Sequence, residues 1–498
     1  MSSSRPDTAG GWRAPLGVGV AVALLVFWVT GSLTRPAVVI DESAYVLQAG
    51  IFAKGHWTGL APPLPEFFEQ LYVLVTPVLA SKYPYGHSLV LAPAVWVGLP
   101  GLAPIILSGL TAALLYALAR RVAGQWVALL TILWWLSNIQ TLYARVTYMS
   151  EVTTAATWLI AWWGALRWRD RRSMPALALC GLAVGWTLIT RPLTGVALAI
   201  PLGVVLWRAR SWRAAVAALA AAAAVVAIIP IGNFYTTGEW RETPLALYTR
   251  LYMPFDGPGF GAGTALPARP LPPDLAATQE FFYRLHRDHH LASLPGDLVA
   301  RAIAVGRDVW GGWRVAFLPF AILGIIWAGT EMAVAIATVG LLILLYLSYP
   351  HPASYTLYYL EGESVLAFFT AYGLVRAIGR LRYGRSALIT CAAVFAVADV
   401  VAARSARATN RADVQYPAAF DALMAPLRNR RAIVFVDYAP SHNANLSVIR
   451  NVPDEQDASV WIVHDRGSAN ARLEALAPDR TPYRFDEAAW RLSPLTPP

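Results

Sequence analysis

Long apolar stretches alternate with short polar ones along most of the chain. A helix that spans a membrane needs about 20 mostly apolar residues. By this measure we predict about eleven spans, several of them short or interrupted by proline. The predicted segments are 15–39, 101–119, 122–142, 151–166, 174–190, 193–207, 214–234, 314–329, 331–349, 363–379 and 386–403. We therefore expect an α-helical polytopic membrane domain over residues 1–403.

The pattern changes after about residue 404, where apolar stretches shorten and charge returns. Segments 432–437, 459–464 and 482–486 resemble buried strands, and 413–428 and 468–477 resemble helices. We predict a small C-terminal α/β soluble domain over residues 404–498.

Arginine distribution predicts the orientation of the spans. If the N-terminus with Arg5 and Arg13 is cytoplasmic, the loops after the second, fourth, sixth and tenth spans are cytoplasmic too. Short cytoplasmic loops are enriched in Lys and Arg. These four loops hold 13 arginines and one acid, Asp170. The arginines are Arg120, Arg121, Arg167, Arg169, Arg171, Arg172, Arg208, Arg210, Arg213, Arg376, Arg380, Arg382 and Arg385.

The longer loops then lie on the exterior side. They cover residues 41–100, 235–313 and 350–362, and the C-terminal domain lies on the same side. Within the first loop, residues 84–99 are apolar but too short to span, so we expect a helix at the membrane interface. The expected location is the bacterial inner membrane.

Composition excludes several classes of protein. Apolar residues make up 57% of the chain and charged residues 14%, where soluble proteins have about 25% charged residues. A disordered chain is excluded, and so is a nucleic-acid binder with a solvated basic face. The expected surroundings are a lipid bilayer. Cys180 and Cys391 lie in apolar runs, which argues against a disulfide framework.

Two adjacent carboxylates, Asp41 and Glu42, follow the first predicted span directly. Ionisable groups at a membrane edge are costly to keep there without a use. One of them suits a general base, and its neighbour suits a metal, a basic residue or an acceptor. The alternative is helix capping, with Asp41 as the N-cap of a helix over 42–53 and Glu42 at its positive end.

A second motif follows in the same loop: Lys82-x-Pro84-x-Gly86-His87. Only two of the 40 basic residues are lysine, and both, Lys54 and Lys82, lie in this loop. The compact ammonium of Lys82 suits a phosphate, although an interfacial lysine that extends toward water is the alternative. His87 either assists in binding or has a structural role.

Together, the Asp41-Glu42 pair, the Lys82 motif and the many spans resemble the GT-C superfamily of membrane glycosyltransferases. The branch with aminoarabinose transferases and protein O-mannosyltransferases is the most similar. The resemblance implies inverting transfer of a sugar from a polyprenyl-phosphate donor to a lipid, glycan or protein acceptor of the cell envelope, on the periplasmic face. Asp41 would be the base, and Glu42 would support it or bind the acceptor. Whether a divalent metal takes part is left open by the resemblance.

The remaining candidates bind the donor phosphate or the substrate. Arg250 and Tyr252 lie in the second exterior loop, with interfacial anchoring as the alternative. Arg191 lies at an exterior helix boundary, where the same alternative holds. Arg145 and Glu151 flank another exterior turn and suit an ion pair. The loop before the tenth span resembles the donor-site loop of GT-C enzymes, with Tyr358, Tyr359 and Glu361 as candidates.

His286, Asp288, His289 and His290 form an H-x-D-H-H cluster that is typical of a solvated helix face, with metal binding as the alternative. Two other functions compete with glycosyl transfer. A transporter or flippase for a lipid-linked or cell-envelope substrate usually has internal repeats and ionisable residues inside its spans, and neither is evident. A membrane scaffold would need neither the carboxylate pair nor the large second loop.

Overall fold

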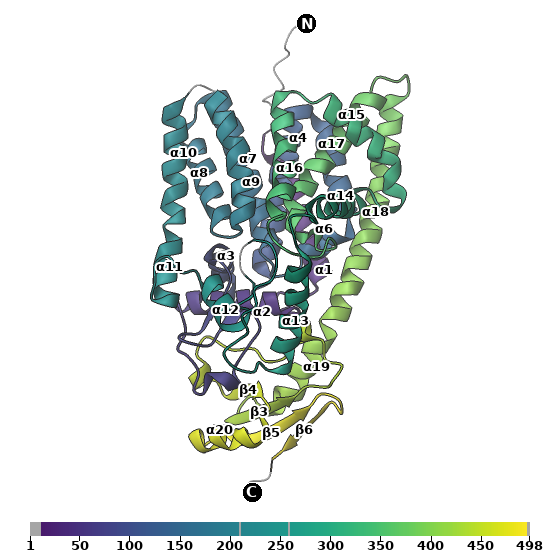
Figure 1. The fold of residues 1–498 in the computed structure, drawn as a ribbon. Coiled ribbons are helices and arrows are strands. Elements are labelled where there is room, and N and C mark those ends of the chain that lie inside the picture. The colour runs from purple at the N-terminus through teal and green to yellow at the C-terminus, as the bar shows by residue number, and fades with distance from the viewer. Residues whose placement is uncertain (1–10, 209–210, 257–258, 496–498) are drawn as a thin grey trace. The chain divides into compact units, whose positions relative to one another are not determined.

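The computed structural model describes residues 11–208, 211–256 and 259–495, without the side chain of Glu331 (Figure 1). Arg5 and Arg210, which entered the predicted orientation, lie outside the described residues. The chain divides into two compact units. The first unit comprises the chain up to Leu33 with Gly101–Ile228 and His289–Asn410, and the second comprises Thr34–Pro100, Ile229–Asp288 and Arg411 onward.

The first unit is helical, and each predicted span overlaps with one of its helices. Figure 1 shows α7, α8 and α10 side by side. Its helices are α1 (Arg13–Thr30), α4 (Leu102–Ala123), α5 (Gln125–Leu136), α6 (Ile139–Ala144), α7 (Glu151–Arg171), α8 (Met174–Leu188), α9 (Pro192–Arg208), α10 (Trp212–Val226), α14 (Leu294–Trp310), α15 (Leu318–Ile326), α16 (Thr330–Tyr346), α17 (Leu360–Ile378) and α18 (Gly384–Asp413).

Four helical segments among the described residues are long and apolar enough to cross a membrane. They are Arg13–Thr30, Leu102–Ala123, Trp212–Thr237 and Gly384–Leu427. A fifth results if Leu294–Trp310 and Gly312–Ile326, which meet at a bend of 97°, count as one broken span. The membrane character of the chain is therefore confirmed, while the number of about eleven spans stays a prediction.

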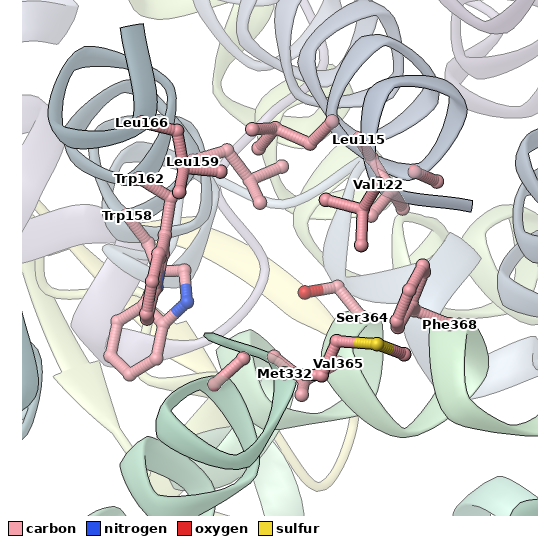
Figure 2. A pocket seen from close by; sticks show the side chains of 13 residues that line it. Leu115, Val122, Trp158, Leu159, Trp162, Leu166, Met332, Ser364, Val365 and Phe368 are labelled. Atoms are coloured by element: carbon pink, nitrogen blue, oxygen red, sulfur yellow. The ribbon is translucent and has the colours of Figure 1, made fainter. Parts of the chain in front are cut away.

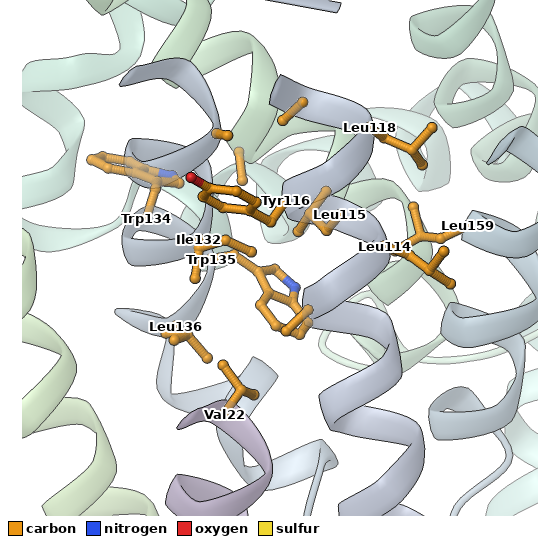
Figure 3. Packing of buried hydrophobic residues seen from close by; sticks show 14 of the residues in the cluster. Val22, Leu114, Leu115, Tyr116, Leu118, Ile132, Trp134, Trp135, Leu136 and Leu159 are labelled. Atoms are coloured by element: carbon orange, nitrogen blue, oxygen red, sulfur yellow. The ribbon is translucent and has the colours of Figure 1, made fainter. Parts of the chain in front are cut away.

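Aromatic and branched side chains fill the interior of the first unit. Trp134 and Trp135 of α5 are buried, and Figure 3 shows them beside Tyr116 and Leu115 of α4. Where helices approach most closely, the backbone itself forms the contact. A Cβ atom on Gly373 of α17 would overlap the backbone of α15, so only glycine fits there. Close packing at small residues is typical of helices in membranes.

The second unit joins the two long loops to the C-terminal region. It contains α2 (Ile40–Ala53), a two-residue ladder of β1 (Val73–Leu74) with β2 (Ala80–Ser81), α3 (Tyr85–Trp96), most of α11 (Ile228–Thr237), α12 (Pro244–Tyr252), α13 (Pro273–Asp288) and α19 (Gln415–Met424). The interfacial segment 84–99 is thus the helix α3, with Pro93 inside it.

The C-terminal region contains a four-stranded sheet in the order β4-β3-β5-β6. The strands are β3 (Ala432–Asp437), β4 (Val460–His464), β5 (Thr481–Asp486) and β6 (Arg491–Pro494), with α20 (Asn470–Leu476) before β5. The central strand β3 runs parallel to β4 and β5, while β6 is antiparallel to β5. The three predicted strands are confirmed, and β6 was not predicted. The predicted boundary between the membrane domain and the C-terminal domain, at residues 403 and 404, lies inside α18.

The first loop and the sheet share one hydrophobic core. Phe67 packs against Phe435 of β3 with ring centroids 6.5 Å apart, and Phe68 packs against Trp461 of β4 at 5.4 Å. Both phenylalanines are fully buried. Burying an aromatic side chain stabilises a fold by a few kcal/mol. The packing of these two phenylalanines therefore stabilises the contact between the C-terminal sheet and the loop that carries the Lys82 motif.

Candidate functional site

The carboxylate pair lies in the first turn of α2. Val39 is the N-cap of this helix, with extended backbone, and Ile40 is its first residue. Asp41 is therefore not the N-cap, and this part of the capping alternative is wrong. Both carboxylates still lie at the helix end where the backbone dipole favours negative charge.

Glu42 is held by groups that precede the helix. Its Oε2 accepts a hydrogen bond from Arg35 Nη1 at 2.7 Å and another from the Val38 backbone N–H at 2.8 Å. The side chains of Arg35 and Glu42 are each 1% exposed. A buried ion pair with additional hydrogen bonds is a fixed element of structure, so Glu42 fixes the start of α2.

Asp41 has different surroundings. Its side chain is partly buried, and its Oδ1 accepts a hydrogen bond from the Tyr83 hydroxyl. Tyr83 in turn stacks on Tyr45 of α2, with ring centroids 4.5 Å apart. Burial raises the pKa of Asp41, and the Tyr83 hydrogen bond and the charge of Lys82 oppose this rise. A carboxylate with a raised pKa suits the role of a general base.

Lys82 lies in a cage of tyrosine rings. Its Nζ is 3.8 Å from the centroid of the Tyr72 ring and 5.1 Å from that of Tyr248, which is a cation–π geometry. Burial lowers the pKa of Lys82 to about 8, against the opposing charges of Asp256 and Asp41. The ammonium is thus desolvated and still charged at neutral pH. Such a group interacts strongly with an anion.

The histidine-rich motif does not form a cluster. His286 is buried and its Nε2 lies 2.5 Å from Asp256 Oδ1, while His289 belongs to the first unit and lies 3.2 Å from Asp297. The solvated helix face predicted for the motif is therefore wrong for these two histidines. Throughout the residues that the structure describes, no three His, Cys, Asp or Glu side chains are placed to hold a metal ion.

The other candidates of the second unit differ in exposure. His87 is buried and lies edge-on to Tyr45 at 4.8 Å. Tyr252 is buried and packs on Tyr248 with ring centroids 4.7 Å apart. Arg250 is 63% exposed and donates to Glu242 at 2.9 Å. Tyr252 therefore packs on the tyrosine cage of Lys82, His87 packs on Tyr45, and Arg250 stays accessible to an anionic ligand.

A second charged cluster lies inside the first unit. Arg191 Nη1 lies 3.5 Å from Glu151 Oε1 and 3.8 Å from Glu361 Oε1, and it donates to the Leu357 carbonyl at 3.2 Å. Glu361 also accepts a hydrogen bond from Thr154. The structure thus brings together residues of α7, the residue directly before α9 and the first turn of α17, which are far apart in the sequence.

Arg145 belongs to the same cluster. Its guanidinium is buried 5.3 Å from the Trp135 ring, and it is attracted by the charges of Glu361, Glu363 and Glu151. Glu151 is thus one of three carboxylates whose charges act on Arg145, and a direct ion pair between these two residues stays a prediction. A buried group of carboxylates and arginines offers both hydrogen-bond acceptors and donors to a polar ligand.

The two tyrosines of the loop before α17 have separate surroundings. Tyr359 is fully buried, and its hydroxyl lies 3.0 Å from His351 Nε2. Burial lowers the pKa of His351 to about 3, so this imidazole is neutral. Tyr358 is partly buried and its ring lies 5.1 Å from the Arg191 guanidinium. Of the two, Tyr358 is the one whose ring can contact a ligand.

An apolar pocket opens between α4, α7, α16 and α17 (Figure 2). Its empty volume is about 630 Å³, including solvent at the mouth. Figure 2 shows Trp158 and Trp162 on one side and Val365 and Phe368 on another. Ser364 also lines the pocket, and its hydroxyl donates to the Glu361 carbonyl at 2.7 Å. The pocket thus borders the helix turn that carries the charged cluster.

The chain resembles known proteins in part of its sequence and in its fold. Residues 101–233, about a quarter of the chain, match the family model described as dolichyl-phosphate-mannose-protein mannosyltransferase. No curated protein matches the sequence. The fold is similar to that of ArnT from Cupriavidus metallidurans bound to undecaprenyl phosphate, with a TM-score of 0.55, 14% identity and coverage of 95% of this chain and 89% of ArnT.

The apo state of the same ArnT gives a TM-score of 0.54 at 14% identity, with the same coverage of 95% and 89%. The oligosaccharyltransferase AglB from Archaeoglobus fulgidus is less similar, with a TM-score of 0.39, 13% identity and coverage of 84% of this chain and 58% of AglB. At these identities the likeness to ArnT shows the fold. The predicted resemblance to GT-C membrane glycosyltransferases is confirmed.

Proposed function

We propose that this chain is a glycosyltransferase of GT-C type, and that it transfers a sugar, with inversion, from a polyprenyl-phosphate donor to an acceptor hydroxyl or amine. The observation that carries the proposal is Asp41, a partly buried carboxylate with a raised pKa, hydrogen-bonded by Tyr83 and near the charge of Lys82. A raised pKa makes a carboxylate a stronger base, which suits this role.

In the proposed reaction, the acceptor loses a proton to Asp41 and its oxygen or nitrogen attacks the anomeric carbon. The bond between that carbon and the phosphate oxygen breaks, and polyprenyl phosphate leaves with the electron pair. The attack from the opposite face inverts the configuration. Positive charge is needed where negative charge develops on the phosphate, and Lys82, Arg191 and Arg250 are the candidates for this role.

Two observations support a lipid-linked donor. The structurally similar ArnT was solved with undecaprenyl phosphate. In addition, the apolar pocket of the first unit, lined by residues such as Trp158 and Phe368, offers a surface that suits an isoprenoid chain. We propose Tyr358 as a contact for the donor sugar, because aromatic rings bind the apolar face of sugars. We propose Glu361 as a second substrate-binding residue.

The proposed location is the inner membrane of a bacterium, with eleven spans and a cytoplasmic N-terminus. The loops 41–100, 235–313 and 350–362 and the C-terminal region 404–498 then lie on the periplasmic side. This orientation keeps the arginine-rich short loops in the cytoplasm. It also places Asp41 and Lys82 on the side where lipid-linked sugars serve as donors.

The experiment is a transfer assay in membranes that contain a pool of radiolabelled polyprenyl-phosphate sugars. Wild type is compared with Asp41→Asn, which keeps the size of the side chain and removes its basicity. Asp457→Asn is the matched control, because Asp457 is an exposed aspartate of the second unit. The folded amounts of all three proteins are equalised by size-exclusion chromatography.

We expect wild type and Asp457→Asn to transfer label at equal rates. Asp41→Asn should lose at least about two orders of magnitude in rate, the usual contribution of a general base. Equal transfer by Asp41→Asn and wild type would refute Asp41 as the base. No transfer by any of the three proteins would refute the polyprenyl-phosphate pool as the donor.

A further inference from the structure

Tyr83 was not among the residues that the sequence singled out, yet it is the side chain bonded to Asp41. We propose that Tyr83 is a positioning residue for the base: its hydroxyl holds Asp41 Oδ1, and Oδ2 takes the proton of the acceptor. The inference rests on the proposed function of Asp41. It adds a second group whose removal weakens the reaction without removing the base.

The surroundings of Tyr83 fix its ring on two sides. Tyr45 stacks on it at 4.5 Å with an interplanar angle of 20°, and Tyr72 lies edge-on at 5.7 Å. Tyr45 belongs to α2, the same helix as Asp41. A ring held in this way presents its hydroxyl in one direction, so the carboxylate is ordered before a substrate binds.

A tyrosine that only packed in the loop would not need its hydroxyl. The neighbouring Tyr85 gives the comparison, because its hydroxyl bonds to the Asn233 side chain at 3.2 Å and does not contact Asp41. Both tyrosines lie within the motif that begins at Lys82; Tyr85 is buried and Tyr83 is partly buried. Changing each to phenylalanine removes one hydroxyl and keeps the ring.

The Tyr83 hydroxyl also affects the titration of Asp41. A hydrogen bond to the charged form of a carboxylate lowers its pKa. The other charged or titratable groups that face Asp41 are Lys82, which favours the carboxylate, and Glu42, which disfavours it. Lys82 is in turn faced by Asp256, which is paired with His286. Tyr83→Phe leaves all these groups in place, so the pKa of Asp41 should rise.

The test uses the full-length protein in detergent micelles and infrared spectroscopy of the protonated carboxyl band. The difference between wild type and Asp41→Asn identifies the band of Asp41, and its amplitude is followed against pH. We expect the midpoint to move up by about one pH unit in Tyr83→Phe. In Tyr85→Phe the midpoint should stay at its wild-type value.

A second measurement uses the opposite perturbation. Tyr83 is replaced by a difluorotyrosine, whose hydroxyl is a stronger donor while it stays protonated and whose ring has nearly the same size. The midpoint of Asp41 should then move down. This variant keeps the inference testable if the phenylalanine variant folds poorly. An unchanged midpoint in both variants, or equal shifts in Tyr83→Phe and Tyr85→Phe, would overturn the inference.

The transfer assay separates this inference from the proposed function. We expect Tyr83→Phe to lose at least about tenfold in kcat, with the acid limb of the pH profile displaced upward. Loss of transfer in Asp41→Asn with unchanged kcat and acid limb in Tyr83→Phe would overturn the role of Tyr83 alone. Unchanged transfer in Asp41→Asn would overturn the proposed base, and the role of Tyr83 with it.

Discussion

The ion pair between Arg35 and Glu42 permits a quantitative test of what holds the start of α2. Both side chains are 1% exposed, and Arg35 Nη1 lies 2.7 Å from Glu42 Oε2. The perturbation is a double-mutant cycle of Arg35→Met, Glu42→Gln and the combined variant. Glutamine keeps an acceptor for the Val38 N–H, so the cycle removes the charges and retains that hydrogen bond.

The magnitude follows from burial. Arg35→Met leaves the Glu42 carboxylate buried without its partner, and Glu42→Gln does the same to the guanidinium. Removing one partner of a buried pair typically destabilises a protein by about 3–5 kcal/mol, whereas replacing both is often near neutral. We therefore expect each single variant to lose about 3 kcal/mol or more and the double variant to lose about 1 kcal/mol.

The assay is reversible unfolding of the detergent-solubilised full chain in a denaturing detergent titration, followed by far-ultraviolet circular dichroism. The coupling energy is the difference between the double variant and the sum of the single variants, and the losses given above make it at least about 5 kcal/mol. Additivity within about 0.5 kcal/mol would refute the reasoning, because it would mean that the two charges do not interact in the folded protein.

Four further predictions follow from other parts of the molecule. The pKa of Lys82 is lowered to about 8, and only its charged form attracts phosphate. Binding of undecaprenyl phosphate, measured by tryptophan fluorescence, should therefore weaken as pH rises through 8, and Lys82→Arg should abolish this pH dependence. Equal affinity of the wild type at pH 7 and pH 9 would contradict the prediction. Glu69 is fully buried, and the two arginines that contact it, Arg269 and Arg466, are partly exposed. Glu69→Ala therefore leaves charges that water can solvate, and it should destabilise the chain by about 1–3 kcal/mol in the same unfolding assay. Unchanged stability would contradict this. Gly373→Ala should lower the unfolding free energy by about 1–3 kcal/mol, because a methyl group has no space against α15; unchanged stability would mean that the two helices separate easily. Single cysteines placed within 41–88 should react with a membrane-impermeant maleimide in intact spheroplasts, and those within 167–172 only after lysis; the reverse would overturn the proposed orientation.

Much of the fold was predictable because it depends on local periodicity. Each predicted span overlaps with a helix, and the helix expected over 42–53 begins two residues earlier, at Ile40. The three strands of apolar residues in the C-terminal region were also predicted. Strand β6 was not, because Arg491–Pro494 is polar and pairs only at the edge of the sheet, next to β5. Its position depends on a partner strand and not on its own residues.

The candidate site was predictable only in part. The sequence singled out Asp41 and Lys82 from residue type and order, but the structure supplies their partners. Arg35 precedes Glu42 by seven residues and its role depends on a turn before α2. Tyr83 bonds to Asp41 across 42 residues of sequence. The sequence did contain one indication of this role: Tyr83 directly follows Lys82, and neighbouring residues of one motif share the same surroundings.

The contrast between Asp41 and Glu42 explains why two adjacent carboxylates occur at the end of the first span. Glu42 forms an ion pair with a buried arginine and accepts a hydrogen bond from a backbone N–H, and these contacts stabilise the start of the helix. That arrangement leaves Asp41, one residue away, bound by an uncharged donor, and burial can then raise its pKa. If an arginine bonded Asp41 instead, the carboxylate would be a weak base, since a paired cation lowers the pKa of an acid. In the proposed reaction, Glu42 would therefore hold the backbone of the first helical turn, from which the proposed base, Asp41, projects.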